Sequence, residues 1–370
     1  MTAKNCGTPL PIVSRRMTGS NIIYERKTHM KPVAVYMTNT SPVTFHQVYP
    51  DQRMAQIREC CEISDEIITS ENLDAHREVL SRAKYIFSTW GMLSLTEEQI
   101  DEYLPNLEAV FYSAGTVQYF ARPFLNKGIK VFSAWAANAV PVAEYTVAQI
   151  ILAGKGMFQG MQMIKQAGNK HEGREQARLY TGSLPCNYGE KVGILGAGMI
   201  GKLVIKMLQS YDYEVLVYDP YVSEEAVAQY GARKAGLDEI FSTCQIVSNH
   251  IANLPATVGM LKYEHFSRMP SNGVFINTGR GAQVVEPDLI RAMEEEPART
   301  ALLDVTLPEP PEEDSPLWTL PNVFLTPHIA GSLKNETARM SEYIFEEFKH
   351  HTAGEPCRYE VSLKMLETMA

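Results

Sequence analysis

The stretch KVGILGAGMIGKLVIKML, residues 191–208, constrains the fold of this chain more than any other. Gly196, Gly198 and Gly201 form a G-x-G-x-x-G pattern between an apolar run typical of a strand and one typical of a helix. The first glycine permits a tight turn, the second admits a phosphate close to the backbone, and the third lets the helix pack on the strand. The helix start offers free N–H groups to an anion. The stretch predicts a dinucleotide site that includes Met199 and Ile200.

A carboxylate follows this unit at the distance expected for ribose recognition. Asp219 lies at the end of the next predicted strand, residues 214–220, and 18 residues after Gly201. A carboxylate at this position can accept hydrogen bonds from both ribose hydroxyls and would repel a 2′-phosphate. We therefore expect NAD rather than NADP as the cofactor.

Short β-rich runs alternate with helical patterns on both sides of this motif. The predicted strands are residues 31–37, 83–90, 107–114 and 129–135 in a first series, and residues 191–197, 214–220, 245–251, 273–279, 300–305 and 322–328 in a second. Strands separated by helix-length segments indicate parallel pairing with helices on both faces. The chain is predicted to be α/β, with two doubly wound parallel-sheet domains, of which the second is a Rossmann dinucleotide-binding domain.

The two series are connected by a long apolar segment and a polar one. Residues 140–166 predict one long amphipathic helix that starts near Val142. Residues 168–189 are polar, contain several glycines, and are predicted to be a surface loop. The first 29 residues lack the apolar centre of a signal peptide, and we expect a disordered extension there.

Composition excludes several classes of protein. The net charge of −9 and the lack of a basic run argue against a nucleic-acid partner. We expect no apolar stretch to approach the ~20 residues that span a bilayer, and we therefore predict no membrane partner and a cytoplasmic location. The six cysteines show no C-x-x-C spacing, and we expect no metal site and no disulfide framework.

Three later segments place complementary polar groups after predicted strands. Arg280 lies between two glycines, Glu309 lies in a proline-rich loop after Asp304, and His328 ends the last strand. The carboxyl ends of parallel strands converge on one crevice, so we expect these side chains to meet there. Hydride transfer at a hydroxyl-bearing carbon also moves a proton at the oxygen, and histidine suits that transfer. A carboxylate can orient the imidazole, and an arginine can bind a carboxylate in a bidentate manner. The set suits a 2-oxo acid or 2-hydroxy acid.

From about Ala83 to Ser332 the chain resembles the D-isomer-specific 2-hydroxyacid dehydrogenases. The stretches that carry the resemblance are GIKVFSAWAANAVPVAEYTVAQIIL, VGILGAGMIG, VLVYDP, MPSNGVFINTGRGAQVVE, LLDVTLPEP and LTPHIAGS. The resemblance implies that His328 is the acid/base, that Glu309 pairs with it, and that Arg280 contacts the substrate carboxylate and carbonyl. It also implies that the cofactor is lined by Ile251, Ala252, Thr257, Thr278, Gly279 and Asp304.

The resemblance further implies a substrate domain at residues 30–134 and 334–370, an NAD-binding domain at residues 135–333, and a homodimer formed through the long helix. The family's substrate loops correspond to Trp90, Gly91, Met92 and Gly115. Residues 90–95 carry no cation, and a phosphate buried there without a partner would cost several kcal/mol. Unless a cation is supplied from elsewhere, such as Arg122 or the other subunit, we expect an unphosphorylated 2-oxo acid.

Two alternative functions are also consistent with the sequence. A formate dehydrogenase on the same scaffold would be expected to carry glutamine where Glu309 stands. An NAD(H)-sensing corepressor-like protein could keep the fold and all three polar residues without turnover.

Overall fold

The computed structural model describes residues 31–367, so the predicted extension at residues 1–29 lies outside the described residues. The described part of the chain divides into two compact units. Unit 1 ends at Ala137 and resumes with Lys334–Leu366, and unit 2 comprises Asn138–Leu333.

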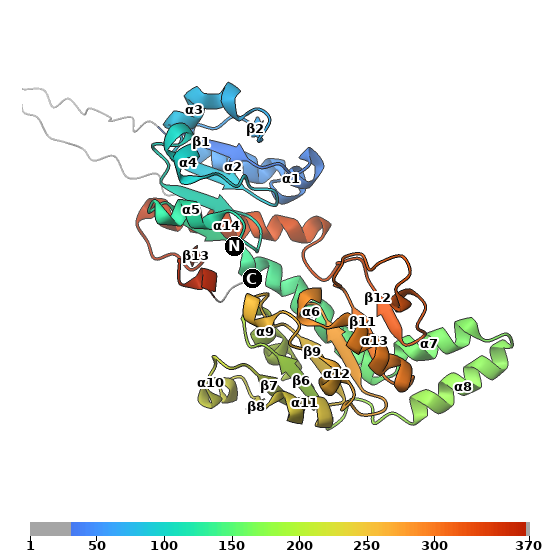
Figure 1. Cartoon of the computed structure of the whole chain (residues 1–370). Helices are drawn as coiled ribbons and strands as arrows, with labels where there is room; N and C mark the ends of the chain where they lie inside the picture. The colour runs from blue at the N-terminus through green and yellow to red at the C-terminus, as the bar shows by residue number, and fades with distance from the viewer. Residues whose placement is uncertain (1–30, 368–370) are drawn as a thin grey trace, which may run out of the picture. The chain divides into compact units, whose positions relative to one another are not determined.

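Unit 1 contains one six-stranded sheet with the order β13-β5-β4-β3-β1-β2. Figure 1 labels the edge strands β13 and β2. All neighbouring strands are parallel except β13, which runs antiparallel to β5 at the edge. The elements of unit 1 are β1 Ala34–Met37, α1 Pro42–Val48, α2 Asp51–Cys60, β2 Ile67–Ile68, α3 Arg77–Arg82, β3 Tyr85–Ser88, α4 Glu97–Tyr103, β4 Ala109–Tyr112, α5 Ala121–Asn126, β5 Lys130–Ser133, α14 Thr337–Ala353 and β13 Glu360–Val361.

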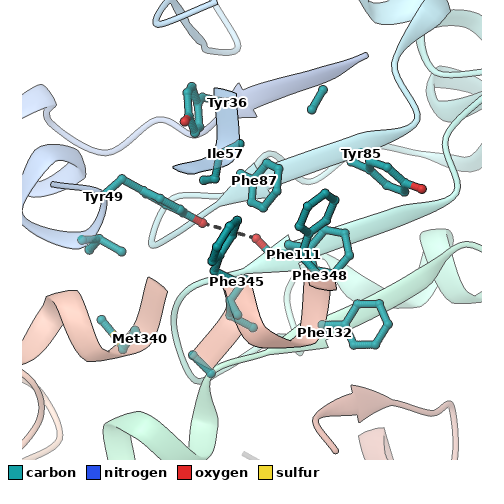
Figure 2. Packing of buried hydrophobic residues seen from close by; sticks show 14 of the residues in the cluster. Tyr36, Tyr49, Ile57, Tyr85, Phe87, Phe111, Phe132, Met340, Phe345 and Phe348 are labelled. Carbon is teal, nitrogen blue, oxygen red and sulfur yellow. Dashed lines mark hydrogen bonds between the residues drawn. The ribbon is translucent and has the colours of Figure 1, made fainter. Parts of the chain in front are cut away.

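An aromatic ladder forms the core between this sheet and α14. Phe87, Phe111 and Phe132 are register partners on β3, β4 and β5, and the centroids of the Phe111 and Phe132 rings are 4.9 Å apart. Phe348 of α14 meets Phe111 edge-on, as Figure 2 shows. These fully buried rings attach the last long helix to the first sheet of the chain.

Unit 2 contains a seven-stranded, all-parallel sheet with the order β12-β11-β10-β9-β6-β7-β8. Its elements, with α6 beginning in unit 1, are α6 Trp135–Gly154, α7 Met157–Gln166, α8 Lys170–Gly182, β6 Lys191–Leu195, α9 Met199–Leu208, β7 Glu214–Tyr218, α10 Glu224–Ala228, β8 Arg233–Lys234, α11 Leu237–Thr243, β9 Ile246–Asn249, α12 Tyr263–Phe266, β10 Val274–Asn277, α13 Glu286–Glu295, β11 Thr300–Leu303 and β12 Val323–Leu325. The central strands are buried throughout, as parallel strands covered on both faces should be. The predicted α/β class with two parallel-sheet domains is confirmed.

The segment between the two series differs from the prediction. The single long helix is two helices, α6 and α7, separated at Gly156, whose backbone takes a left-handed φ of 66°. The predicted loop at residues 168–189 contains α8, which packs along α7. Asn169 caps α8, and Gly173 lies so close to Ala167 that no side chain would fit there. Local capping and helix–helix packing therefore outweigh the polar composition.

One expectation drawn from composition is also corrected. Helix α6 is, within residues 31–367, the one helix long and apolar enough by length and composition to cross a membrane. However, 61% of its apolar stretch is buried inside the structure, as in a core helix of a globular domain. The free cysteines among the described residues are Cys61, Cys186, Cys244 and Cys357.

Candidate cofactor and catalytic site

The glycine loop lies between β6 and α9, as its pattern predicted. Gly196 has a φ of 91°, and a Cβ there would come within 2.7 Å of the His250 carbonyl oxygen. A Cβ on Gly201 would come within 2.0 Å of the Gly196 carbonyl oxygen, so the helix can approach the turn only with glycine at that position. Both glycines are therefore required by the fold itself.

Gly198 differs from its two neighbours because a Cβ there would meet no protein atom within 4 Å. Gly198 is the N-cap of the ten-residue helix α9, and no side chain caps that helix start. Open space over a glycine beside uncapped helical N–H groups fits a pyrophosphate better than a packing role. The residues present therefore fit a dinucleotide.

Asp219 follows β7 and lies beside the glycine loop. Its Oδ2 accepts a hydrogen bond from the Ala197 N–H at 2.8 Å, and its Oδ1 accepts one from the Tyr221 N–H at 2.8 Å. These bonds fix the carboxylate next to the turn, and each oxygen keeps acceptor capacity for a ribose hydroxyl.

The segment after β9 is held by its own hydrogen bonds. The Thr257 hydroxyl donates to the Ala252 and Leu254 carbonyl oxygens at 2.7 and 3.0 Å, and the Ile251 N–H donates to Asn249 Oδ1 at 3.2 Å. Ile251, Ala252 and Thr257 are each partly exposed. These predicted cofactor residues thus form one ordered turn at the carboxyl end of β9.

The predicted acid/base pair is in contact. His328 Nδ1 lies 2.7 Å from Glu309 Oε1, and both side chains are roughly half exposed. Within residues 31–367, His328 Nε2 has no hydrogen-bond partner. The imidazole is therefore oriented through one nitrogen and open at the other.

Asp304 holds the backbone that carries His328. Its carboxylate is buried and accepts hydrogen bonds from the Ile329 and Ala330 N–H groups at 2.8 and 2.9 Å and from the Thr326 hydroxyl at 2.6 Å. His328 has a φ of 54°, a left-handed conformation that is strained for a residue with a side chain. The contacts of Asp304 stabilise this turn, a role beyond the cofactor contact that the resemblance implies.

Arg280 follows β10 and is partly buried. Its Nη1 donates to the Gly279 carbonyl oxygen at 2.8 Å. Burial lowers the pKa of Arg280 from its ordinary value, and the charge of Glu309 raises it. An arginine remains protonated under such shifts, so the group is a cation with limited hydration that can bind an anion.

His250 follows β9, and both of its ring nitrogens lie near hydroxyl groups of unit 2. The ring is buried, Nε2 lies 2.9 Å from Ser248 Oγ, and Nδ1 lies 3.4 Å from Thr278 Oγ1. Burial lowers the pKa of His250 to about 3. Sequence reasoning missed Thr326, Asn249, Asn277 and Gln283; the two asparagines had a signal, since each ends an apolar strand with a polar side chain.

The predicted substrate segments lie in unit 1, after β3 and β4. Trp90 packs against the aromatic core and the Met92 side chain is 2% exposed. Gly91 has a φ of 78° and lies against the Asn39–Thr40 backbone, where a Cβ would come within 2.9 Å of Thr40 N. The Gly115 carbonyl oxygen accepts a hydrogen bond from the Ser133 hydroxyl at 2.7 Å. The Gly91 carbonyl oxygen also accepts a hydrogen bond, from the Asn39 N–H at 2.8 Å, so this backbone is held in place within unit 1.

Comparison with known proteins identifies the class. Residues 147–330 match the family described as D-isomer specific 2-hydroxyacid dehydrogenase, NAD binding domain. The NAD-binding domain of the chain therefore belongs to the D-isomer specific 2-hydroxyacid dehydrogenases, and the NAD prediction is confirmed through this domain.

Two relatives illustrate the sequence similarity. D-3-phosphoglycerate dehydrogenase of Archaeoglobus fulgidus is 30% identical over 241 residues, 65% of this chain and 44% of that protein. The enzyme of the same name from Homo sapiens is 31% identical over 228 residues, 62% of this chain and 41% of that protein. The chain thus matches less than half the length of these two curated relatives.

Solved structures share the fold. A phosphoglycerate oxidoreductase from Rhizobium etli has a TM-score of 0.73 and 20% identity, with 91% of this chain and all of that chain covered. The NAD complexed form of a D-isomer specific 2-hydroxyacid dehydrogenase from Lactobacillus delbrueckii ssp. bulgaricus has a TM-score of 0.67 and 19% identity, with coverage of 89% and 100%.

Proposed function

We propose that the chain is an NAD-dependent oxidoreductase that interconverts a small unphosphorylated 2-oxo acid and its D-2-hydroxy acid. The observation that carries the proposal is the 2.7 Å contact of His328 Nδ1 with Glu309 Oε1, in the unit that contains the glycine loop and Arg280. A histidine oriented at one nitrogen and open at the other is equipped for proton transfer to a substrate oxygen.

In the direction of reduction, His328 donates a proton from Nε2 to the substrate oxygen. Glu309 accepts the hydrogen bond of Nδ1–H, which fixes the ring orientation and stabilises the imidazolium before the transfer. Arg280 binds the substrate carboxylate and polarises the adjacent carbonyl. The nicotinamide cofactor, when bound, supplies or accepts the hydride.

For the cofactor we propose contacts from the glycine loop and Asp219, and from the turn at Ile251, Ala252 and Thr257. Thr278 and Gly279 after β10 and Asp304 after β11 complete the proposed set. The Asp304 carboxylate already accepts three hydrogen bonds, so it can contact the cofactor only through its remaining lone pairs.

For the substrate we propose that unit 1 is the substrate domain and that the backbone at Trp90, Gly91, Met92 and Gly115 contributes to binding. Residues 90–95 contain no lysine or arginine, and the side chains of Met92 and Leu93 are 2% and 3% exposed. Such an environment would not neutralise a phosphate dianion, which supports an unphosphorylated substrate.

The experiment is an NADH oxidation assay of the purified chain with glyoxylate, pyruvate, hydroxypyruvate and phosphohydroxypyruvate. Turnover with one of the first three, at a higher kcat/KM than with the phosphorylated compound, is expected. NADH binding without turnover of any 2-oxo acid would favour the sensor alternative. A clear preference for phosphohydroxypyruvate would overturn the substrate assignment.

We also propose a homodimer. Helices α7 and α8 expose large apolar side chains, among them Met161 at 58% and Leu179 at 64%. Burying these side chains against a second copy would remove apolar surface from water. Light scattering should give twice the chain mass, and Met161→Glu with Leu179→Glu should shift it toward the monomer; a monomeric unmodified chain would contradict the proposal.

A further inference from the structure

A cluster of three buried amide side chains lies at the carboxyl ends of β9 and β10. We call Asn249, Asn277 and Gln283 the amide cluster; none of the three is more than 1% exposed. Asn249 and Asn277 are register partners on the two adjacent strands. Asn249 Nδ2 donates to Asn277 Oδ1 at 3.0 Å and to Gln283 Oε1 at 3.1 Å.

The amide cluster binds the backbone on both sides of Arg280. Gln283 Oε1 accepts a hydrogen bond from the Arg280 N–H at 2.9 Å, and Asn277 Nδ2 donates to the Arg280 carbonyl oxygen at 3.2 Å. Asn277 Oδ1 also accepts from the Gly279 N–H at 3.1 Å. Both backbone polar groups of the arginine are therefore fixed by side chains.

Gln283 is not fully satisfied by these bonds. Its Nε2 is buried and has no hydrogen-bond partner within residues 31–367. A buried donor without a partner costs free energy, whereas the two hydrogen bonds that Gln283 Oε1 accepts, from Asn249 Nδ2 and from the Arg280 N–H, stabilise the fold. The acceptor that Gln283 presents to the Arg280 N–H therefore links this buried glutamine to the candidate site.

We propose that Gln283 is a positioning residue that acts through Arg280. Its amide oxygen, itself held by Asn249, sets the direction in which the Arg280 side chain leaves the strand end. The guanidinium is thereby preorganised to meet the planar carboxylate of a 2-oxo acid. This inference rests on the proposed function, and it places the effect of Gln283 on substrate binding rather than on cofactor binding.

The test uses Gln283→Met, which keeps the shape and removes the hydrogen bonds, and Gln283→Leu, which removes them with a different shape. Oxalate serves as the planar carboxylate probe, titrated into the chain saturated with NADH and followed by NADH fluorescence. NADH binding, the melting temperature and the kcat and KM of the best 2-oxo acid are measured in parallel.

The matched control is Gln159→Met. Gln159 is also buried, and its Nε2 donates to the Ala298 and Arg299 carbonyl oxygens and to the Thr300 hydroxyl. None of these partners is a predicted site residue. This variant should lower the melting temperature and leave oxalate affinity and KM unchanged, which is the signature of a structural amide.

For both Gln283 variants we expect oxalate affinity to fall about ten-fold or more, with a matching rise in KM, because a misdirected guanidinium loses its bidentate geometry. The dissociation constant of NADH should stay within about two-fold. Unchanged oxalate affinity and KM would overturn the proposal, and so would Gln283 variants that fail to fold. If the unmodified chain neither binds oxalate nor reduces any 2-oxo acid, the proposed function itself fails. That result is distinct from an active unmodified chain whose Gln283 variants keep the same oxalate affinity and KM, which would overturn only the role of Gln283.

Discussion

Replacing His250 with glutamine should make the free energy of unfolding less sensitive to pH between 7 and 5. The imidazole is buried among Ser248, Thr278 and the turn at Gly196, and burial lowers its pKa from 6.5 to about 3. Glutamine fills a similar volume and does not titrate, so the comparison isolates the proton taken up by this ring.

The magnitude follows from the two pKa values. As the pH falls below 6.5, His250 binds a proton in the unfolded chain, whereas in the folded chain it stays neutral until the pH approaches about 3. The stability associated with the neutral ring is therefore present above pH 6.5 and is lost progressively as the pH falls toward 3. Between pH 7 and pH 5 the loss from this residue amounts to about 2 kcal/mol.

The assay is chemical denaturation of the unmodified chain, of His250→Gln and of His171→Gln at both pH values. His171 is exposed on α8, so its variant should retain the pH dependence of the unmodified chain. The His250 variant should lose about 2 kcal/mol less stability than the unmodified chain on going to pH 5. The reasoning is refuted if the two lose the same stability to within about 0.5 kcal/mol.

Three further predictions concern the site. Gly198→Ala should fold normally but bind NADH more weakly. Gly201→Ala should instead lose about 2 kcal/mol or more of stability, because its Cβ would lie 2.0 Å from the Gly196 carbonyl oxygen. Thermal melts and NADH titrations separate the two variants, and equal behaviour would contradict a cofactor role for Gly198 and a packing role for Gly201. Glu309→Gln should lower kcat for reduction about ten-fold or more, since the His328 ring loses the charged acceptor that orients it. An unchanged kcat would argue against the pair. The ratio of kcat/KM with NADH to kcat/KM with NADPH should be about ten or more, and it should fall in Asp219→Ser. Equal use of the two cofactors by the unmodified chain would show that the Asp219 carboxylate does not discriminate against the 2′-phosphate.

The predictable part of the fold depends on patterns that are local in sequence. All ten predicted strands are present, because buried parallel strands form continuous apolar runs bounded by turn residues. The short strands β2, β8 and β13 were not predicted, since edge strands of two residues leave no periodicity. Helix α8 was missed because its polar composition resembles a loop, whereas its cap at Asn169 and its packing on α7 determine the outcome.

In the candidate site too, features that are local in sequence could be predicted, whereas tertiary contacts could not. The glycine loop and the positions of Arg280, Glu309 and His328 at strand ends could be predicted, because parallel strands bring their carboxyl ends together. The contacts around them could not. Gln283 lies 34 residues from Asn249, and Asp304 holds the His328 turn through two backbone N–H groups, so both roles depend on tertiary structure.

The central claim, that His328 is the acid/base of a 2-hydroxyacid dehydrogenase, is tested most directly by His328→Ala with His171→Ala as the control. Turnover of the best 2-oxo acid should fall by ~10²-fold or more in His328→Ala, while the dissociation constant of NADH stays within about two-fold of the unmodified value. Near-normal turnover in His328→Ala would contradict the account and remove this histidine from the reaction.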